Sequence, residues 1–343
     1  MAFTELSLPI LLAIFAVAGL VILTCGVQMT GLADRIADRT GLGEALVGGV
    51  LLGASTSLSG TVVSLTAALD GRASLAFSNG VGGIAAQTAF LALADLIYRR
   101  ANLEHAAAEL ANVFQGALLA LLLAIPVLAY AGPEVTILGV HPASVVLVVV
   151  YLAGVVASKR VRDEPMWRPV GTRQTQEDTP DEEQQDTRGN LPLFTRFAVL
   201  LSFMGVAGWT IAQVASELVD RFELSASLVG ALMTAVVTSL PELVTTLAAV
   251  RRGALQLAVG GIIGGNTFDT LFLTLSDAGY RDGSIYHALT RDDYFWLATG
   301  LVMTTILLLG LIYRERQGPG GIGFESAGIL AVYTGAIIVQ SIA

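Results

Sequence analysis

Charged residues are scarce in this chain. Of its 343 residues only 14% are Asp, Glu, Lys or Arg, whereas soluble domains usually carry about 25%. Aromatic residues contribute 7%, while hydrophobic residues make up 54% and gather in runs of about twenty, the length that a helix needs to cross a bilayer. This composition excludes a soluble enzyme, a disordered protein and a coiled coil. It predicts an all-α integral membrane protein that lies in the cell membrane and contacts the lipid bilayer.

Cysteine and lysine are almost absent. The single cysteine, Cys25, excludes a disulfide framework and a CxxC metal site. Lys159 stands alone among the basic residues, which are otherwise arginines, and the net charge of −9 argues against nucleic acid binding. No basic segment precedes the first apolar run, so we expect a retained span rather than a signal peptide. No nucleotide motif or covalent catalyst is present, and we expect no enzymatic activity and no organic cofactor.

The apolar runs predict ten membrane spans, each long enough to cross with some tilt. The extended hydrophilic stretch at 158–191 reads as a loosely held acidic linker between two five-span units, 1–157 and 192–343. The predicted spans cover residues 8–28, 44–69, 74–98, 110–131, 135–157, 192–216, 226–250, 255–280, 293–313 and 322–342.

The distribution of basic residues predicts the orientation. Fifteen of the 19 fall in loops on the side of the 158–191 linker, and four fall on the other side. We therefore expect a cytoplasmic linker and both termini outside. The four outer residues are Arg72, Arg221, Arg281 and Arg291.

The two halves match each other without a gap at an offset of 182 residues. Rare residues coincide in this register, for example Asp95 with Asp277 and His105 with His287. Since each half has five spans, an odd number, the second copy is expected to be inverted. Inverted repeats are typical of secondary transporters, which bind their substrate near the midplane. Asp95 and Asp277 also stand near Arg99 and Arg281, which predicts interfacial charge pairs.

The chemistry lies on two spans of the second half. Thr238-Ser239-Leu240-Pro241-Glu242 combines two hydroxyls, a carboxylate and a proline that frees a backbone carbonyl. The next span carries Gly260 to Asp269, in which glycines accompany Asn266. Oxygen ligands of this kind suit a hard cation, and a carboxylate within a membrane span is typical of a functional site.

These residues resemble the cation/calcium exchanger superfamily. Thr238 to Glu242 match its TS-x-PE motif in full, and Gly260 to Asn266 match its GN-x-x-GSN type motif in part, with Gly261 and Gly265 at the usual Asn and Ser positions. The resemblance extends to the five-plus-five layout and the central loop. It implies a fold in which both repeats wall a central ion site. It also implies antiport of calcium against sodium or protons by alternating access.

The first half departs from the family pattern. At the offset of 182, Gly60 faces Glu242 and Gln87 faces Asp269. The resemblance implies that one motif glutamate from each repeat holds calcium, and this chain has only one of them. Two alternatives therefore stay open. One is a monovalent-cation or proton-coupled carrier that has lost calcium binding, and the other is a non-transporting membrane partner protein with the exchanger fold.

Eight residues are candidate ligands for the transported cation. Each also has a structural interpretation, since buried carboxylates, amides and hydroxyls bond to neighbouring helices or to the preceding turn. The candidates are Glu242, Ser239, Thr238, Asn266, Asp269, Thr56, Ser57 and Asn79.

Overall fold

The computed structural model describes residues 3–40, 55–98, 100–175, 190–318 and 321–342. Three features of the sequence interpretation lie outside these residues: the start of the second predicted span, Arg99, and residues 176–189 of the linker. The described residues form helices joined by loops, with one isolated β-bridge between Ile137 and Val140. The prediction of an all-α fold is confirmed.

Each repeat has a long helix near its start. Each also has a short helix of four residues, Leu103–Ala106 in the first repeat and Ile285–Ala288 in the second, and these two short helices lie at equivalent positions of the two repeats. The first comprises η1 (Phe3–Glu5), α1 (Leu8–Thr40), α3 (Leu58–Leu69), α4 (Ala73–Ile97), α5 (Leu103–Ala106), α6 (Leu110–Ala131) and α7 (Pro142–Asp163). The second comprises α8 (Asn190–Phe222), α9 (Ala226–Leu228), the π-helical turn η3 (Val229–Thr234), α10 (Ala235–Thr238), α11 (Leu240–Arg252), α12 (Leu255–Asp269), α13 (Leu271–Gly279), α14 (Ile285–Ala288), α15 (Arg291–Tyr313) and α16 (Phe324–Ile342).

The backbone repeats at the offset found in the sequence. Helices α1 and α8 each contain 33 residues and begin 182 positions apart. Four glycines with positive φ form two pairs at the same offset: Gly71 (74°) with Gly253 (84°), and Gly139 (81°) with Gly321 (79°). Left-handed backbone favours glycine because it has no Cβ. The turns are therefore duplicated together with the helices.

The prediction of ten membrane spans is not confirmed in full among the described residues, which leave out the start of the predicted span at 44–69. Seven described helices are long and apolar enough to cross a membrane, and a bent pair, Ala226–Thr238 with Leu240–Arg252, raises the total to eight. This pair bends by 47° at Ser239, where Pro241 cannot donate a backbone hydrogen bond. Helix α3 is short, and the predicted span at 255–280 is divided into α12 and α13 at Thr270.

The helices next to the linker extend into its predicted range, 158–191. Helix α7 continues through Ser158 to Asp163, and α8 begins at Asn190. In the described part of the linker, Thr172 contacts His105 at 2.8 Å and the carbonyl of Val170 accepts a hydrogen bond from Arg314 at 2.9 Å. This part of the linker is thus held against the helical body.

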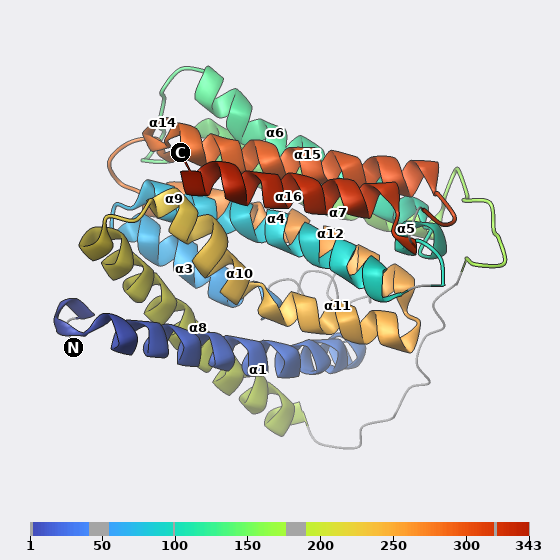
Figure 1. Ribbon diagram of the computed structural model, residues 1–343, viewed down its shortest axis with the longest axis horizontal. Helices are drawn as coiled ribbons and strands as arrows, with labels where there is room; N and C mark the ends of the chain where they lie inside the picture. Colours follow the sequence, from blue (N-terminus) through green and yellow to red (C-terminus); the bar gives the residue numbers. More distant parts are fainter. Residues whose placement is uncertain (1–2, 41–54, 99, 176–189, 319–320, 343) are drawn as a thin grey trace.

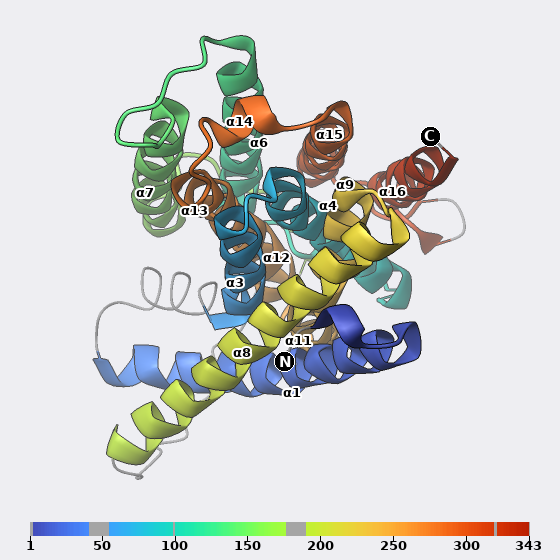
Figure 2. The same ribbon diagram turned by 90° about the vertical axis from the view of Figure 1, so that its left-hand side faces the viewer.

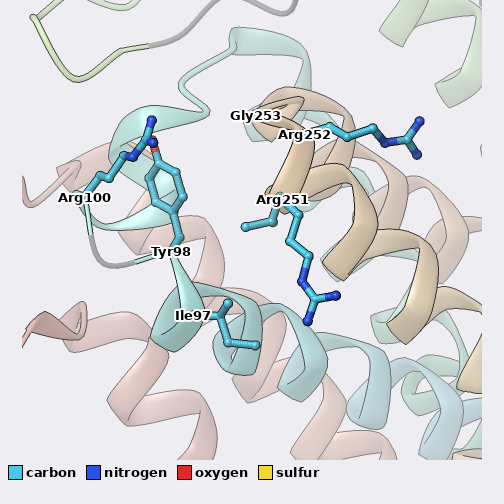
Figure 3. A pocket seen from close by; sticks show the side chains of 7 residues that line it. Ile97, Tyr98, Arg100, Arg251, Arg252 and Gly253 are labelled. Carbon is cyan, nitrogen blue, oxygen red and sulfur yellow. The ribbon is translucent and has the colours of Figure 1, made fainter.

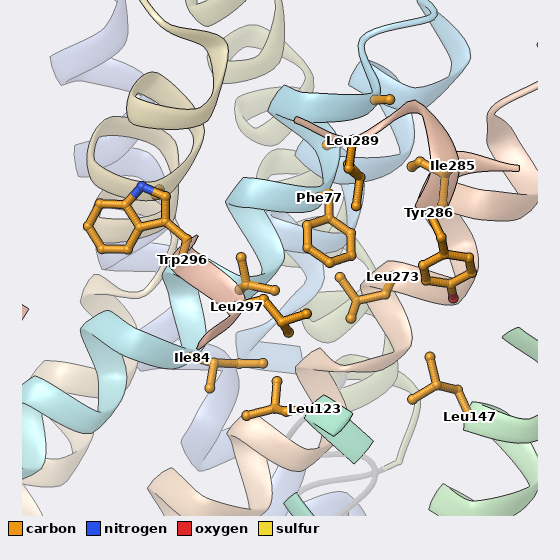
Figure 4. Packing of buried hydrophobic residues seen from close by; sticks show 14 of the residues in the cluster. Phe77, Ile84, Leu123, Leu147, Leu273, Ile285, Tyr286, Leu289, Trp296 and Leu297 are labelled. Atoms are coloured by element: carbon orange, nitrogen blue, oxygen red, sulfur yellow. The ribbon is translucent and has the colours of Figure 1, made fainter. Parts of the chain in front are cut away.

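The helices form three layers (Figures 1 and 2). Helices α1 and α8 cross on one side of the molecule and pack against each other. Helices α3, α4, α11 and α12 lie in the middle, and α6, α7, α15 and α16 cover the other side. Large apolar side chains, among them Phe77, Leu273 and Trp296, fill the space around α4 (Figure 4). Polar side chains on the buried helix α4 must therefore find partners within the protein.

Asp95 joins the two repeats through backbone donors. Its carboxylate accepts hydrogen bonds from the N–H of Leu103 at 2.7 Å and from the N–H of Gly323 at 3.2 Å. The first donor belongs to α5 of its own repeat, and the second precedes α16 of the other repeat. This carboxylate therefore fastens the last helix of one repeat to the short helix of the other.

Asp277 makes the same connection at the offset of 182. It accepts from the N–H of Ile285 at 3.2 Å and from the N–H of His141 at 2.7 Å, and also from the hydroxyl of Ser144 at 2.7 Å. No ion pair with Arg281 is present among the described residues. The expected pairing of Asp277 with Arg281 is thus corrected, since Asp277 accepts from backbone and hydroxyl donors of both repeats, whereas the expected pairing of Asp95 with Arg99 lies outside the described residues.

Candidate cation-binding site

The Thr-Ser pairs of the two repeats lie at equivalent helix starts. Ser57 is the N-terminal cap position of α3, with φ −84° and ψ 1°, and Ser239 holds that position in α11, with φ −95° and ψ 4°. The first repeat has Ser59 where the second has Pro241, so proline is not required for this break. Both breaks place hydroxyls and freed backbone groups within the helical core.

A direct hydrogen bond joins the two repeats across the centre. The Gln87 side-chain amide on α4 donates to the Asp269 carboxylate on α12 at 2.7 Å, and these residues are 182 positions apart. The same amide nitrogen donates to the Ser239 hydroxyl at 3.3 Å. Residues that the repeat makes equivalent therefore face each other, and the contact brings α4, α11 and α12 to one place.

Both central carboxylates come from the second repeat. Glu242 on α11 is 6% exposed and Asp269 is 2% exposed, and they are close enough for their charges to interact. The hydroxyl of Thr56 faces the Glu242 carboxyl group, and that of Ser57 faces the Asp269 carboxyl group. Hydroxyl groups of the first repeat therefore lie next to carboxyl groups of the second repeat.

Several buried oxygens at this place form no hydrogen bond of good geometry within the described parts of the chain, although the Thr56 and Ser57 hydroxyls face two of the carboxyl groups. A buried oxygen without a donor is costly unless a proton, water or cation binds it. Carboxylate, amide and hydroxyl oxygens are the ligands that hard cations prefer. These oxygens are Oε1 and Oε2 of Glu242, Oδ1 of Asp269, Oε1 of Gln87, Oγ of Ser57 and Oδ1 of Asn266.

Asn266 joins this group through α4. It lies one helical turn before Asp269 on α12, and its amide donates to the hydroxyl of Thr88 at 3.0 Å. Thr88 directly follows Gln87, so α4 presents two successive polar residues to α12. Neither Gln87 nor Thr88 is among the eight candidate ligands, although the offset of 182 pairs Gln87 with Asp269.

Asn79 lies elsewhere on α4. Its amide donates to the Gly60 carbonyl at 3.1 Å and to the Ser64 hydroxyl at 2.9 Å, and its oxygen accepts from the Thr234 hydroxyl at 2.7 Å. Asn79 is two helical turns from Gln87, and protein groups take up its hydrogen-bonding capacity. The structure places it in the packing of α3, α4 and η3.

Thr238 and Gly60 lie at the edge of the centre. The Thr238 hydroxyl donates to the Ala235 carbonyl at 3.2 Å, within its own turn. A Cβ atom at Gly60 would lie 3.6 Å from that hydroxyl but only 2.8 Å from Cε2 of Phe272. The ring of Phe272 therefore occupies space that a first-repeat glutamate would need.

The candidate site contains two carboxylates, those of Glu242 and Asp269. No group of three His, Cys, Asp or Glu side chains able to hold a metal ion is present among the described residues. A calcium ion takes six to eight oxygens, so neutral oxygens would have to supply most of the ligands.

A cavity of about 400 Å³ lies away from this centre, between the ends of α4 and α11 (Figure 3). It is lined by Tyr98, Arg100 and residues 250–253, and the arginine side chains point in different directions. Arg251 and Arg252 occupy the last turn of α11, where basic residues offset the helix dipole. None of the candidate ligands lines this cavity.

Comparison with known proteins shows the family to which this chain belongs. A family profile described as sodium/calcium exchanger protein matches residues 10–159 and 193–342. The chain is 32% identical over 152 residues to the inner membrane protein YrbG of Escherichia coli, a match that covers 44% of each protein. It is 33% identical over 111 residues to the putative antiporter CaxA of Alkalimonas amylolytica, covering 31% of this chain and 34% of CaxA. These matches span less than half the length of either relative.

Solved structures share the whole fold. The structure of native YfkE superposes with a TM-score of 0.62 at 12% identity and covers 96% of this chain and 92% of that one. A structure of the sodium-calcium exchanger NCX_Mj superposes with a TM-score of 0.55 at 17% identity, covering 96% and 98%. At these identities the likeness establishes the fold. The family match places the chain among multi-pass helical membrane proteins.

Proposed function

Because this chain belongs to the sodium/calcium exchanger family of cation antiporters, we propose that it exchanges calcium for sodium or protons at a site centred on Glu242 and Asp269. The observation that carries this proposal is the pair of buried carboxylates at the interface of the repeats, in which three of the four oxygens receive no hydrogen bond of good geometry from the described chain. Such a pair needs positive charge to be stable in a membrane core.

Charge balance explains how the pair supports exchange. Two ionised carboxylates carry two negative charges, which are offset by one calcium ion or by two monovalent cations. Calcium and the counter-ions would therefore replace one another at the same oxygens. Ser57, Gln87 and Asn266 supply further oxygens for calcium without adding charge.

The crossed helices α1 and α8 are suited to alternate access to this centre. They pack on each other, α8 packs on α3, and α1 packs on α11, so they contact both helices that begin at a Thr-Ser pair. In transporters with inverted repeats, rocking or sliding of one bundle against the other exposes a fixed site to each side in turn. We expect the 158–191 linker to face the cytoplasm and both termini to face outside, as the basic residues predict.

A second candidate function is a sodium- or proton-coupled carrier that does not bind calcium. Two observations favour it: Gly60 lacks the carboxylate that its equivalent Glu242 provides, and Gln87 is an amide where its equivalent is Asp269. Only two of the four equivalent positions are then acidic. The two candidates differ in a single measurable property, which is calcium flux.

The test is ion flux in proteoliposomes under imposed sodium, proton and calcium gradients. We expect calcium uptake driven by an outward sodium or proton gradient in the wild type, and loss of uptake in Glu242→Gln and Asp269→Asn. Glu217→Gln is the matched control, because Glu217 lies on α8 beside Arg221, outside the candidate site. Sodium–proton exchange without calcium flux would favour the second candidate, and absence of any flux would favour the partner-protein alternative.

A further inference from the structure

A second pair of carboxyl groups is buried far from the proposed ion site. Glu104 on α5 and Glu325 in the first turn of α16 are each 1% exposed. Their carboxyl groups lie within hydrogen-bonding reach of each other. They come together beyond Asp95, which lies eight residues along α4 from Gln87, or about 12 Å at 1.5 Å per residue.

The carboxyl oxygens of this pair have no donor in the described chain. All four Oε atoms are buried and receive no hydrogen bond from an N–H or O–H group, and the neighbouring Ser326 hydroxyl is also without a partner. The chain nevertheless makes room for Glu325. A Cβ atom at Gly310 would lie 2.5 Å from Cγ of Glu325, and one at Gly323 would also overlap its carboxyl group. The neighbouring residues thus leave space for the Glu325 carboxyl group but give it no hydrogen bond.

Further acidic groups surround the pair. Asp95 and Glu315 both act on Glu325 through their charges, and Asp95 also acts on Glu104. Burial, reinforced by the charges of Asp95 and Glu325, raises the pKa of Glu104 well above its ordinary value. Two carboxylates this close cannot both ionise without a counter-charge.

The nearby basic groups are engaged in other contacts. The ring nitrogens of His105 contact the Arg314 carbonyl and the Thr172 hydroxyl, each at 2.8 Å. The Arg314 guanidinium donates to the carbonyls of Val170 and His105. Among the described residues neither basic group forms an ion pair with Glu104 or Glu325.

The other repeat shows what normally fills this space. At the offset of 182, Tyr286 corresponds to Glu104 and Ala143 to Glu325. The Tyr286 hydroxyl bonds the Ser144 hydroxyl at 2.7 Å, and Ser144 donates to Asp277 at 2.7 Å. Each of the three groups, the two hydroxyls and the Asp277 carboxylate, therefore has a hydrogen-bond partner. The Glu104 and Glu325 side chains need a proton of their own to form an equivalent connection.

We propose that Glu104 and Glu325 form a proton-binding site, in which one shared proton joins the two carboxyl groups and fastens α5 of the first repeat to α16 of the second. The proton makes one carboxyl group a donor and leaves the other an acceptor, so two orphaned oxygens become a charge-assisted hydrogen bond. Loss of the proton leaves two adjacent buried charges and opens this contact. The site is separate from the proposed transport site and makes the linker side of the protein sensitive to pH.

The direction of the pH effect follows from the shared proton. A group that holds its proton more tightly when folded contributes stability at low pH and loses it as the pH rises through the folded pKa. The wild-type unfolding temperature should therefore fall by about 2 °C per pH unit between the ordinary carboxyl pKa and the raised folded pKa, and level off above the folded pKa. Glu104→Gln and Glu325→Gln each remove one charge and supply a permanent amide donor, so this fall should disappear. Glu109→Gln, a partly exposed position paired with Arg162, should retain it.

The purified full-length protein in detergent serves for the test, with thermal unfolding measured from pH 5 to pH 9 (roughly the range in which a carboxyl group of raised pKa titrates). Infrared spectra at neutral pH should show a protonated carboxyl stretch that both single Gln variants lose and Glu109→Gln keeps. An unchanged infrared spectrum in the single variants would overturn the proposal. So would a calcium-dependent rise in unfolding temperature that persists in Glu242→Gln and vanishes in Glu104→Gln, because the pair would then hold a divalent cation.

Discussion

Gly60→Ala should destabilise the folded protein, although alanine usually stabilises a helix. Gly60 lies in the first turn of α3, and a Cβ atom there would lie 2.8 Å from Cε2 and 3.2 Å from Cζ of Phe272. Alanine gains about 0.5–1 kcal/mol over glycine within a helix, whereas forcing an extra carbon into a packed core costs about 1–3 kcal/mol. The loss should exceed the gain, with a net change of about 1 kcal/mol.

Phe272→Leu isolates the cause of this effect. Leucine lacks the outer ring atoms that Gly60 approaches, so the clash is removed while the site stays apolar. In the Phe272→Leu background, Gly60→Ala should therefore raise stability by about 0.5–1 kcal/mol, the ordinary helix gain. Unfolding temperatures of the four proteins in a double-mutant cycle measure this change of sign. The same effect of Gly60→Ala in both backgrounds would refute the clash.

The same ring limits repair of the ion site. Gly60→Glu restores the carboxylate that the family resemblance implies, and a further carboxylate should strengthen calcium binding. With Phe272 present, the new side chain is held away from Glu242, so we expect a gain in calcium uptake only in the Gly60→Glu, Phe272→Leu double variant. Uptake of radiolabelled calcium into proteoliposomes, with Phe272→Leu alone as the control, measures it. An equal gain from Gly60→Glu alone would show that Phe272 does not block the position.

Two other predictions concern the scaffold. Asp277→Ala leaves three donors without an acceptor, and Asp95→Ala leaves two. Because each orphaned donor costs about 1–3 kcal/mol, Asp277→Ala should lower the unfolding temperature more than Asp95→Ala does. The reverse order would contradict the assigned contacts. A cysteine at the exposed position Arg173, in a Cys25→Ala background, should resist an impermeant thiol reagent applied to intact cells, and labelling from outside would overturn the cytoplasmic placement of the linker.

The sequence predicts the family and the repeat because both depend on local matches along the chain. The TS-x-PE motif and the coincidence of Asp95 with Asp277 identify them, and the family resemblance is confirmed. The offset of 182 residues recurs in helix bounds, in positive-φ glycines and in the hydrogen bonds of both aspartates. A register fixed by rare residues therefore extends to three-dimensional contacts.

The partners of individual polar side chains do not follow from such matches. Asn79 faces Gly261 in the repeat alignment, yet its contacts are with Ser64 and Thr234, which only packing brings to it. The break between α12 and α13 at Thr270 could not be predicted either, because no proline stands there in the sequence. Gln87 was visible as the equivalent of Asp269, but its direct hydrogen bond to that residue requires the two repeats to meet face to face.

The two buried acidic pairs, Glu242 with Asp269 and Glu104 with Glu325, are places where the two repeats differ from each other. The Asp95 and Asp277 contacts are nearly identical in the two repeats, so they hold the fold together without distinguishing one end from the other. At the centre, the second repeat supplies both Glu242 and Asp269 while the first supplies Gly60 and Gln87. At one end, Glu104 and Glu325 replace the Tyr286 and Ala143 of the other end. The hydrogen bonds that define the fold are thus repeated, whereas the groups that we propose to bind cations or protons are present only once. The asymmetry of the two halves is therefore confined to a few side chains on a repeated backbone.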